Sequence, residues 1–204
     1  MTLSEFDNEI RKDYNVVCGC DEAGRGSLAG DVFAAAVIFD KDTVIEGIND
    51  SKKLTAKKRE ELFDEIMEKA VDFSIQTATV EEIEDINILN AAMLAMKRAV
   101  EDMDTKPDVC LIDGNKTPEG LECPAIAVVK GDAKSQAVAA ASILAKVARD
   151  RYMEQMAEQY PEYRFEKHKG YGTKLHYQMI DQYGPCGIHR MSFLKKYYAK
   201  KNGH

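Results

Sequence analysis

Residues 14–26 read Y-N-V-V-C-G-C-D-E-A-G-R-G. The first half of this segment is short, apolar and rich in β-forming residues, which predicts a buried strand. Asp21 and Glu22 stand at the end of that strand, and Arg25 follows between two glycines. Residues 32–39, V-F-A-A-A-V-I-F, predict a second strand. We therefore expect a sheet in which two adjacent carboxylates and a Gly-Arg-Gly loop lie between consecutive strands.

Adjacent carboxylates at the end of a buried strand need a cationic partner, because an uncompensated buried charge is costly. A divalent metal beside a backbone loop that holds a phosphate or a hydroxyl would supply it, which indicates metal-dependent chemistry on a phosphodiester. The alternatives are a solvated acidic loop and a dinucleotide-binding loop. The second alternative is disfavoured because Gly24, Gly26 and Gly30 are spaced G-x-G-x-x-x-G and precede a strand rather than a helix.

The composition indicates one domain with a small appendage. With 204 residues, 45% of them apolar, the chain can bury one good core. It begins without a basic or apolar leader and has no run of about 18 apolar residues, so we expect a cytoplasmic protein without a membrane segment. Its five cysteines form no C-x-x-C pair and are expected to be free thiols rather than zinc ligands. We also expect a monomer.

The net charge of −7 is unevenly distributed along the chain. Residues 1–163 carry 19 Lys/Arg and 33 Asp/Glu, whereas residues 164–204 carry nine and two. A cationic end beside an acidic body fits a phosphate backbone that lies across the first and reaches metals held by the second. The alternative is a solvated basic tail. We divide the chain accordingly into a catalytic domain, residues 1–160, and a basic, mainly helical substrate-binding segment, residues 161–204.

Apolar periodicity predicts strands that alternate with helices, with no internal repeat. Strands are expected at 16–21, 32–39, 71–77, 108–113 and 125–130, the third half-exposed and the last two buried, and helices at 55–70, 79–100 and 134–160. The second helix starts with capping-box spacing between Thr79 and Glu82. The small residues 137–142 allow the third helix to pack closely on a sheet. The first helix is expected to bury one face made of Leu62, Phe63, Ile66, Met67 and Ala70.

Four carboxylates stand at or just beyond the ends of predicted central strands: Asp21, Glu22, Asp113 and Asp132. If these strands are neighbours, the four side chains converge. Like charges at close range raise one another's pKa, and two Mg²⁺ or Mn²⁺ ions would remove that repulsion, since these metals prefer hard oxygen ligands. One ion could then activate water while the other stabilises the leaving oxygen.

Seven motifs in order resemble those of type 2 ribonuclease H, ribonuclease HII. They are G-C-D-E-A-G-R-G at 19–26, D-S-K-K-L at 50–54, L-I-D-G at 111–114, V-V-K-G-D at 128–132, A-A-S-I-L-A-K-V-A-R-D at 140–150, H-K-G-Y-G-T at 168–173 and H-R-x-S-F at 189–193. The resemblance implies a ribonuclease-H-like three-layer α/β fold with a mixed five-stranded sheet and a small helical C-terminal part. It also implies an enzyme that cleaves the RNA strand of RNA–DNA hybrids and nicks DNA on the 5′ side of an embedded ribonucleotide, leaving 3′-hydroxyl and 5′-phosphate ends.

The resemblance also implies a role for individual residues. Asp21, Glu22, Asp113 and Asp132 match the catalytic, metal-binding acids. Gly24, Arg25 and Gly26 match the loop that recognises the ribose 2′-hydroxyl, where a Cβ would hold the backbone away from the sugar. Ser51, Lys52 and Lys53 match a phosphate-contacting turn, and Tyr171 matches an aromatic residue that packs on the 3′ sugar. From the residues alone, Lys52 and Lys53 would be a solvated turn and Tyr171 a rim aromatic.

Two positions depart from the family pattern. Ser27 and Asp31 stand where the family often has proline, which predicts a more flexible loop. Asp31 also brings a negative charge near the site, either as a partner of Arg25 or as a mild penalty on phosphate approach. Besides a ribonuclease HII, a different metal nuclease on a similar fold and a non-catalytic hybrid-binding protein remain as alternatives.

The last motif concerns residues 191–198, M-S-F-L-K-K-Y-Y. Its spacing resembles the segment by which replication and repair enzymes dock on a sliding clamp, with Leu194, Tyr197 and Tyr198 as anchors and Met191 where glutamine is usual. The alternative is that Phe193, Leu194 and Tyr197 pack the last helix onto the body.

Overall fold

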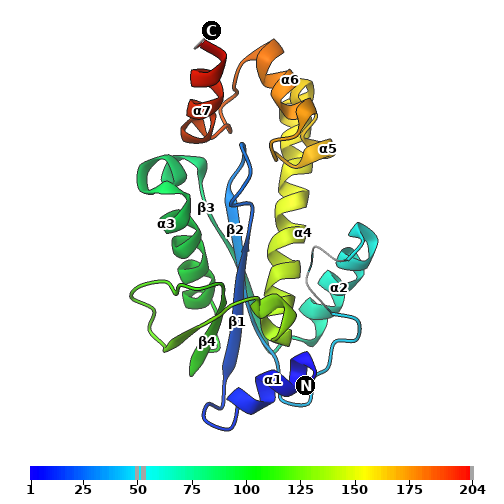
Figure 1. The fold of residues 1–204 in the computed structure, drawn as a ribbon. Helices are drawn as coiled ribbons and strands as arrows, with labels where there is room; N and C mark the ends of the chain where they lie inside the picture. The colour runs from blue at the N-terminus through cyan, green and yellow to red at the C-terminus, as the bar shows by residue number, and fades with distance from the viewer. Residues whose placement is uncertain (49–50, 52–53, 203–204) are drawn as a thin grey trace.

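The computed structural model describes residues 1–48, 51 and 54–202. Its centre is a mixed five-stranded sheet in the order β3-β2-β1-β4-β5 (Figure 1). β1 and β2 are antiparallel, as are β2 and β3, whereas β4 is parallel to both β1 and β5. The strands are β1 (Val17–Ala23), β2 (Val32–Ile38), β3 (Asp72–Ala78), β4 (Val109–Asp113) and β5 (Ala125–Val128). The predicted α/β fold with a mixed five-stranded sheet is confirmed.

Helices cover both faces of the sheet and continue beyond one end of it (Figure 1). α3 packs on one face and α4 on the other, and α2 lies outside α4. The helices are α1 (Leu3–Ile10), α2 (Ala56–Lys69), α3 (Val80–Glu101), α4 (Gln136–Gln159), α5 (Phe165–His168), α6 (Lys174–Tyr183) and α7 (Met191–Asn202), with 3₁₀ turns η2 (Gly131–Ala133) and η3 (Pro161–Tyr163). No described helix is long and apolar enough to cross a membrane.

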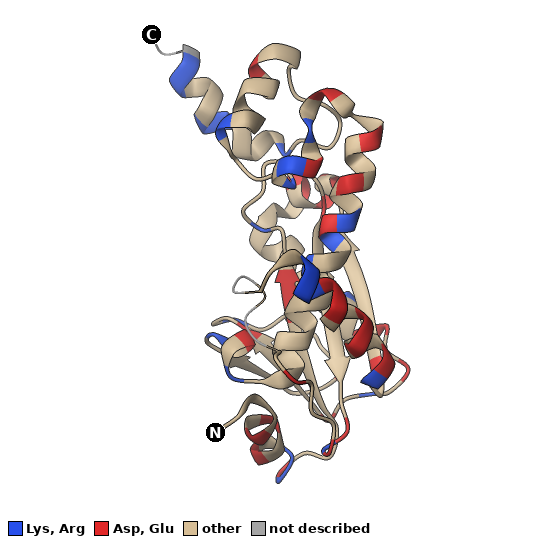
Figure 2. Cartoon of the chain, turned by 90° about the vertical axis from the view of Figure 1, so that its right-hand side faces the viewer, with Lys and Arg blue, Asp and Glu red and all other residues tan. Residues whose placement is uncertain are grey.

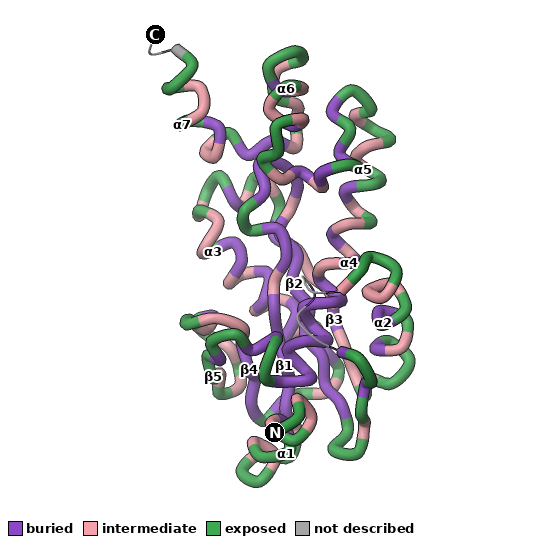
Figure 3. The backbone as a smooth tube through the Cα atoms, turned by 45° about the vertical axis from the view of Figure 1, so that its right-hand side comes forward, coloured by how far each residue is buried: buried purple, intermediate pink, exposed green. Residues whose placement is uncertain are grey.

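The central strands β1 and β2 are buried on both faces (Figure 3). Successive side chains of each strand therefore pack alternately against the helices on one face of the sheet and those on the other. In β1, Cys18 and Cys20 face α3, whereas Gly19 faces α4. A Cβ at Gly19 would lie 2.2 Å from the carbonyl carbon of Ala137, so only glycine allows α4 to approach this closely. The small residues at the start of α4 are all buried, as the sequence predicts.

Several details differ from the sequence predictions. α1 was not expected, although Thr2 and Glu5 form a capping box that signals its start. Met67 is 41% exposed, although Leu62, Phe63 and Ile66 of the predicted face are buried. β5 is an edge strand with two exposed residues rather than a buried strand, since only β4 pairs with it. α3 carries a kink at Asn87, whose φ is 68°.

The C-terminal helices form a small second core above the sheet, around the end of α4 (Figure 1). α5 and η3 pack on α4, and α6 packs on both of them. Arg190 joins this part to the body through hydrogen bonds to the loop between β1 and β2. The basic segment is therefore part of the folded protein and not a loose tail.

Candidate active site

The first two acids lie inside β1 and not at its end. Parallel pairing of β1 with β4 stops at Cys20 and Ile112, but β1 continues to Ala23 against β2 alone. Extending the parallel register by one residue puts Asp21 level with Asp113, the last residue of β4. The two carboxylates therefore meet where the sheet loses one strand, and this opening exposes them to a pocket.

The pocket holds most of the predicted site residues. Its volume is about 300 Å³. The described residues that line it are Asp21, Glu22, Ala23, Gly24, Arg25, Gly26, Ser51, Asp113, Ser142, Lys146 and Tyr171. The structure thus brings together three of the four acids, the Gly-Arg-Gly loop, the serine of the predicted phosphate turn and the predicted sugar-packing tyrosine. Lys52 and Lys53 lie outside the described residues.

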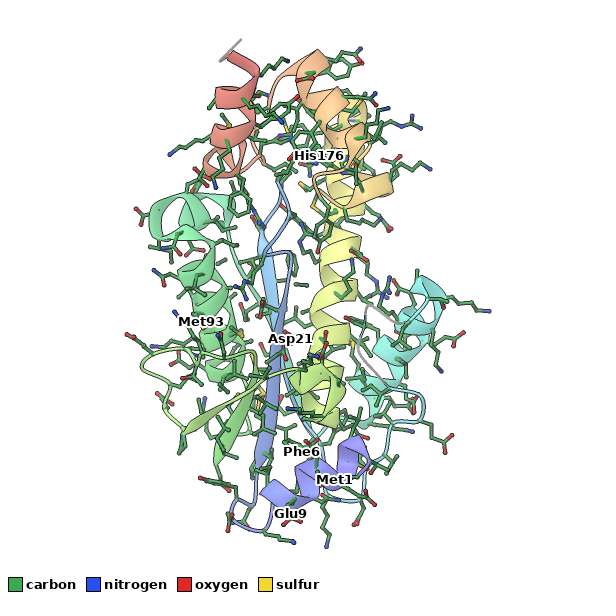
Figure 4. The ribbon with its side chains drawn as sticks, in the orientation of Figure 1. Met1, Phe6, Glu9, Asp21, Met93 and His176 are labelled. Carbon is green, nitrogen blue, oxygen red and sulfur yellow. The ribbon has the colours of Figure 1, made fainter. Side chains whose placement is uncertain are left out.

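Asp21 is a buried acid whose charged form is strongly disfavoured. It is buried between the sheet and α4 in the middle of the molecule (Figure 4). Burial raises the pKa of Asp21 well above its ordinary value, and repulsion from Glu22 and Asp113 raises it further. A hydrogen bond with Ser142 on α4 acts in the opposite direction. Ser142 in turn shares a hydrogen bond of 3.0 Å with the hydroxyl of Ser51.

Asp132 is not among the described residues that line the pocket. It lies on η2, just beyond β5, and the prediction that this strand is central is wrong, because β5 is the edge of the sheet. It is only 8% exposed. The backbone N–H of its neighbour Gly131 donates to Oδ1 of Asp113 at 2.7 Å, which ties η2 to the end of β4.

The described acids do not form a closed ligand shell. Among residues 1–48, 51 and 54–202, no group of three or more His, Cys, Asp or Glu side chains is placed to hold a metal ion. The donor chemistry nevertheless fits Mg²⁺ or Mn²⁺, because the pocket offers hard carboxylate oxygens. A cation would also offset the mutual repulsion that raises the pKa of Asp21.

The Gly-Arg-Gly loop has a defined shape. Gly24 has a φ of 97°, in the region that favours glycine, and a Cβ there would lie 2.0 Å from Nε of Arg149. Gly26 has no such restriction, since nothing lies within 4 Å of its would-be Cβ. Arg25 pairs with Glu22 at 3.0 Å, so Asp31 is not its partner. Asp31 instead accepts a hydrogen bond from the N–H of Val80 at 2.9 Å.

Tyr171 is held at the rim of the pocket by backbone pairing with Ser27. Its ring lies 5.3 Å from the guanidinium carbon of Arg149 and 5.8 Å from Nζ of Lys146. The sequence analysis did not select Ser142, Lys146 or Arg149. Their spacing of four and three residues within the motif 140–150 places them on one face of α4, and this signal could have identified them.

The comparison with known families now decides the identity of the chain. The model of the ribonuclease HII family matches residues 18–196, which includes every element that lines the pocket. The chain belongs to the ribonuclease HII family. It is 54% identical to the ribonuclease HII of Caldicellulosiruptor saccharolyticus over 189 residues, 93% of this chain and 92% of that protein. It is 58% identical to the ribonuclease HII of Idiomarina loihiensis over 178 residues, 87% and 95% of the two chains.

Solved structures agree with this membership of the ribonuclease HII family. The ribonuclease H2 of Pyrococcus horikoshii is 29% identical, with a TM-score of 0.74 over 92% of this chain and 100% of that chain. The ribonuclease HII in the PCNA complex from Archaeoglobus fulgidus is 25% identical, with a TM-score of 0.68 over 86% and 94% of the two chains. A ribonuclease HIII solved in complex with Mn²⁺ is 17% identical, with a TM-score of 0.71, and shares the fold.

Proposed function

We propose that the pocket between β1, β4 and α4 is the active site of this ribonuclease HII. There the enzyme hydrolyses the RNA strand of RNA–DNA hybrids and nicks DNA on the 5′ side of an embedded ribonucleotide, leaving 3′-hydroxyl and 5′-phosphate ends. The main support for the proposal is that three acids and the loop from Gly24 to Gly26 line the same pocket. A metal-dependent nuclease that is selective for ribonucleotides needs both a metal-binding group and a group that recognises the sugar, and the pocket offers candidates for both.

Asp21, Glu22, Asp113 and Asp132 would hold two Mg²⁺ or Mn²⁺ ions in the catalytic complex. When bound, such ions activate a water molecule and stabilise the leaving oxygen. The burial of Asp21 and its repulsion by Glu22 and Asp113 support this assignment, because a cation is the simplest relief of that repulsion. The hydroxyl of Ser142 on α4 lowers the pKa of Asp21 and so favours its charged, metal-binding form.

The remaining pocket residues would position the nucleic acid. The backbone of Gly24, Arg25 and Gly26 would contact the ribose 2′-hydroxyl, the group that distinguishes RNA from DNA at one nucleotide. Ser51, with Lys52 and Lys53 of the same motif, would contact a phosphate, and Tyr171 would pack on the sugar on the 3′ side. Lys146 adds a cation within the pocket, although an ion pair of 2.6 Å with Asp150 partly neutralises it.

The C-terminal segment would contact the phosphate backbone of the duplex. Figure 2 shows basic residues on α7, all of them lysines, and no acidic residue there. Lys195, Lys196 and Lys200 are exposed on this helix. Phosphate contacts of this kind supply affinity and register without reading sequence.

One cleavage assay tests the central proposal. The substrates are a DNA duplex with a single ribonucleotide, the same duplex without it, and an RNA–DNA hybrid, each with Mg²⁺ and with Mn²⁺. We expect cleavage of the first and third only, with a 3′-hydroxyl at the new end by mass spectrometry. Cleavage of the all-DNA duplex would indicate a metal nuclease that ignores the 2′-hydroxyl, and cleavage of none would indicate a hybrid-binding protein.

A sliding clamp is the second partner to test, since the Archaeoglobus fulgidus structure contains PCNA with a ribonuclease HII. In this chain Leu194 is 0% exposed, and the rings of Tyr197 and Tyr177 lie 4.6 Å apart. Helix packing, the alternative drawn from the sequence, is thus present in the structure. Docking through Leu194, Tyr197 and Tyr198 would require α7 to separate from α6. Calorimetry of the whole chain with a clamp tests this, and absence of binding would remove the proposal.

A further inference from the structure

Two arginines are completely buried beneath the loop that joins β1 to β2. Arg149 comes from α4 and Arg190 from the turn before α7, and both are 0% exposed. A buried guanidinium needs all of its N–H groups satisfied. The acceptors here are mostly carbonyl oxygens of one short loop.

Arg190 donates to four carbonyls of the loop. Its Nη1 atom contacts the oxygens of Gly24, Arg25 and Ser27 at 2.8, 3.1 and 2.9 Å. Its Nε and Nη2 atoms contact the oxygen of Gly30 at 2.9 and 2.7 Å. The loop is therefore wrapped around a single planar guanidinium.

Arg149 completes the set of contacts. Its Nε atom donates to the oxygen of Asp31 at 3.2 Å, and its Nη2 atom to the oxygen of Ala29 at 3.1 Å. Nη2 also donates to the hydroxyl of Ser27 at 2.7 Å, and that hydroxyl donates to the oxygen of Gly24 at 2.8 Å. Ser27 is thus a bridge between the two buried arginines and the loop.

The orientation of these carbonyls fixes the opposite side of the same peptide units. A peptide unit is planar and trans, so its carbonyl points away from the N–H of the following residue. Because Arg190 holds the carbonyls of Gly24 and Arg25, the N–H groups of Arg25 and Gly26 are turned away from it. Both residues line the pocket, and within the described part of the chain neither N–H group makes a hydrogen bond.

Asp31 partly offsets the positive charge of the two arginines. Burial and, to a smaller extent, the neighbouring charge of Arg149 lower the pKa of Arg190 to about 9, and Asp31 opposes both effects. Asp31 is also fixed by its hydrogen bond from the N–H of Val80. Ser27 and Asp31, the two positions where flexibility was expected, are therefore built into a buried polar network.

We propose that Arg190 and Arg149, bridged by Ser27, are positioning residues that aim the N–H groups of Arg25 and Gly26 at the ribose 2′-hydroxyl. They set the preference for a ribonucleotide without contacting the substrate. This inference rests on the proposed function, because it assigns a cause to the sugar recognition placed in that loop.

The test compares binding to two duplexes of identical sequence, one with a single ribonucleotide and one of DNA only, in EDTA so that the substrate stays intact. The wild-type protein is expected to prefer the first. Arg190→Lys keeps the positive charge but loses the planar guanidinium group that binds several carbonyls at once. The Kd for the all-DNA duplex divided by the Kd for the ribonucleotide duplex should therefore fall by about tenfold, which corresponds to the loss of one hydrogen bond. The Kd for the all-DNA duplex should stay nearly constant, because it reports phosphate contacts. The ratio does not depend on the folded fraction of a variant.

Ser27→Ala is the second variant, since it removes only the bridging hydroxyl, and it should lower the same ratio. Arg98→Lys is the control, because Arg98 donates to the carbonyl of Thr77 and to the carboxylate of Glu82 and lies on α3, not under the loop. Preserved preference in Arg190→Lys and Ser27→Ala, parallel weakening of both affinities, or equal binding of both duplexes by the wild type would overturn the inference. Failure of the wild type to cleave at a ribonucleotide would instead overturn the proposed function.

Discussion

The Nε2 atoms of His176 and His189 lie 3.0 Å apart in the C-terminal core. Nδ1 of His176 contacts the carbonyl oxygen of Tyr171 at 3.0 Å, so this nitrogen must carry the proton. Nε2 of His176 then accepts from Nε2 of His189, whose Nδ1 accepts from the N–H of Cys186 at 2.9 Å. Both imidazoles are therefore neutral, with fixed tautomers, and His176, in the C-terminal part of the molecule (Figure 4), holds the backbone of Tyr171.

This pair predicts a loss of stability in mild acid. Burial lowers the pKa of His176 to about 3 and that of His189 to about 4, below the ordinary 6.5. As the pH falls, the histidines of the unfolded chain bind protons before those of the folded protein do. The stabilisation is therefore fully present above pH 6.5, and the free energy of unfolding decreases as the pH drops toward the pKa values of the folded state. Each histidine should cost about 1.4 kcal/mol at pH 5.5.

Thermal unfolding at pH 7.5 and 5.5 measures the effect, with His176→Gln as the comparison. Asp7 and Asp21 have raised pKa values and change stability in the opposite direction, so the difference between the two proteins isolates the histidine. Equal changes in Tm for wild type and variant would show that His176 is not the titrating group.

Asp21→Asn should eliminate cleavage while leaving the fold as stable or more stable. The pKa of Asp21 is raised in the folded protein, so its ionised form costs stability at neutral pH, and the amide removes that cost. We expect a gain of about 0–2 kcal/mol. Asp64→Asn, at an exposed position on α2, is the control and should retain cleavage. Turnover near the wild-type rate by Asp21→Asn in Mg²⁺ would refute the metal site.

Gly24→Ala and Gly26→Ala should distinguish the contribution of the loop to stability from its contribution to cleavage. A Cβ at Gly24 meets Arg149 and requires a φ of 97°, so we expect this variant to lose about 1–3 kcal/mol and most of its activity. At Gly26 the space is open, so the Tm should be unchanged. Cleavage by Gly26→Ala should still fall, because a methyl group would hold the sugar away from the backbone. Full activity of Gly26→Ala would mean that the ribose does not approach this residue.

Tyr171→Ala should weaken the preference for a deoxyribose on the 3′ side of the cleaved bond. The ring is half-buried at the rim of the pocket and close to Arg149 and Lys146, where it can pack on a sugar. Tyr171→Phe keeps the ring and should retain the preference. Cleavage at an RNA–DNA junction relative to an all-RNA strand measures it, and an unchanged ratio in Tyr171→Ala would exclude Tyr171 from this role.

Replacing Lys195, Lys196 and Lys200 with Gln should reduce the salt dependence of duplex binding. Each lost phosphate contact lowers the slope of log affinity against log salt by about 0.9. Substitution is preferable to deletion, because Tyr197 on the same helix packs on Tyr177. The control variant changes Lys12, Lys41 and Lys69, exposed cations of the body, and should keep the wild-type slope. An identical slope in both variants would place α7 away from the duplex.

The sequence by itself determined the five strands, the three long helices and the family, and it proposed the four acids. These follow from local signals: the apolar run before Asp21, the capping box at Thr79 and the small residues that let α4 approach the sheet. Such signals depend only on residues a few positions apart, so they can be recognised in the sequence without knowledge of the fold.

Only the tertiary structure decided which groups meet and which are hidden. Asp21 is level with Asp113 because β1 and β4 pair in one parallel register, which no local pattern specifies. Arg190 binds the carbonyl of Gly24 across 166 positions of the chain, so its role under the loop is invisible in the H-R-x-S-F motif. Leu194 likewise has the spacing of an exposed anchor but is buried, because contacts between distant segments depend on the path of the whole chain.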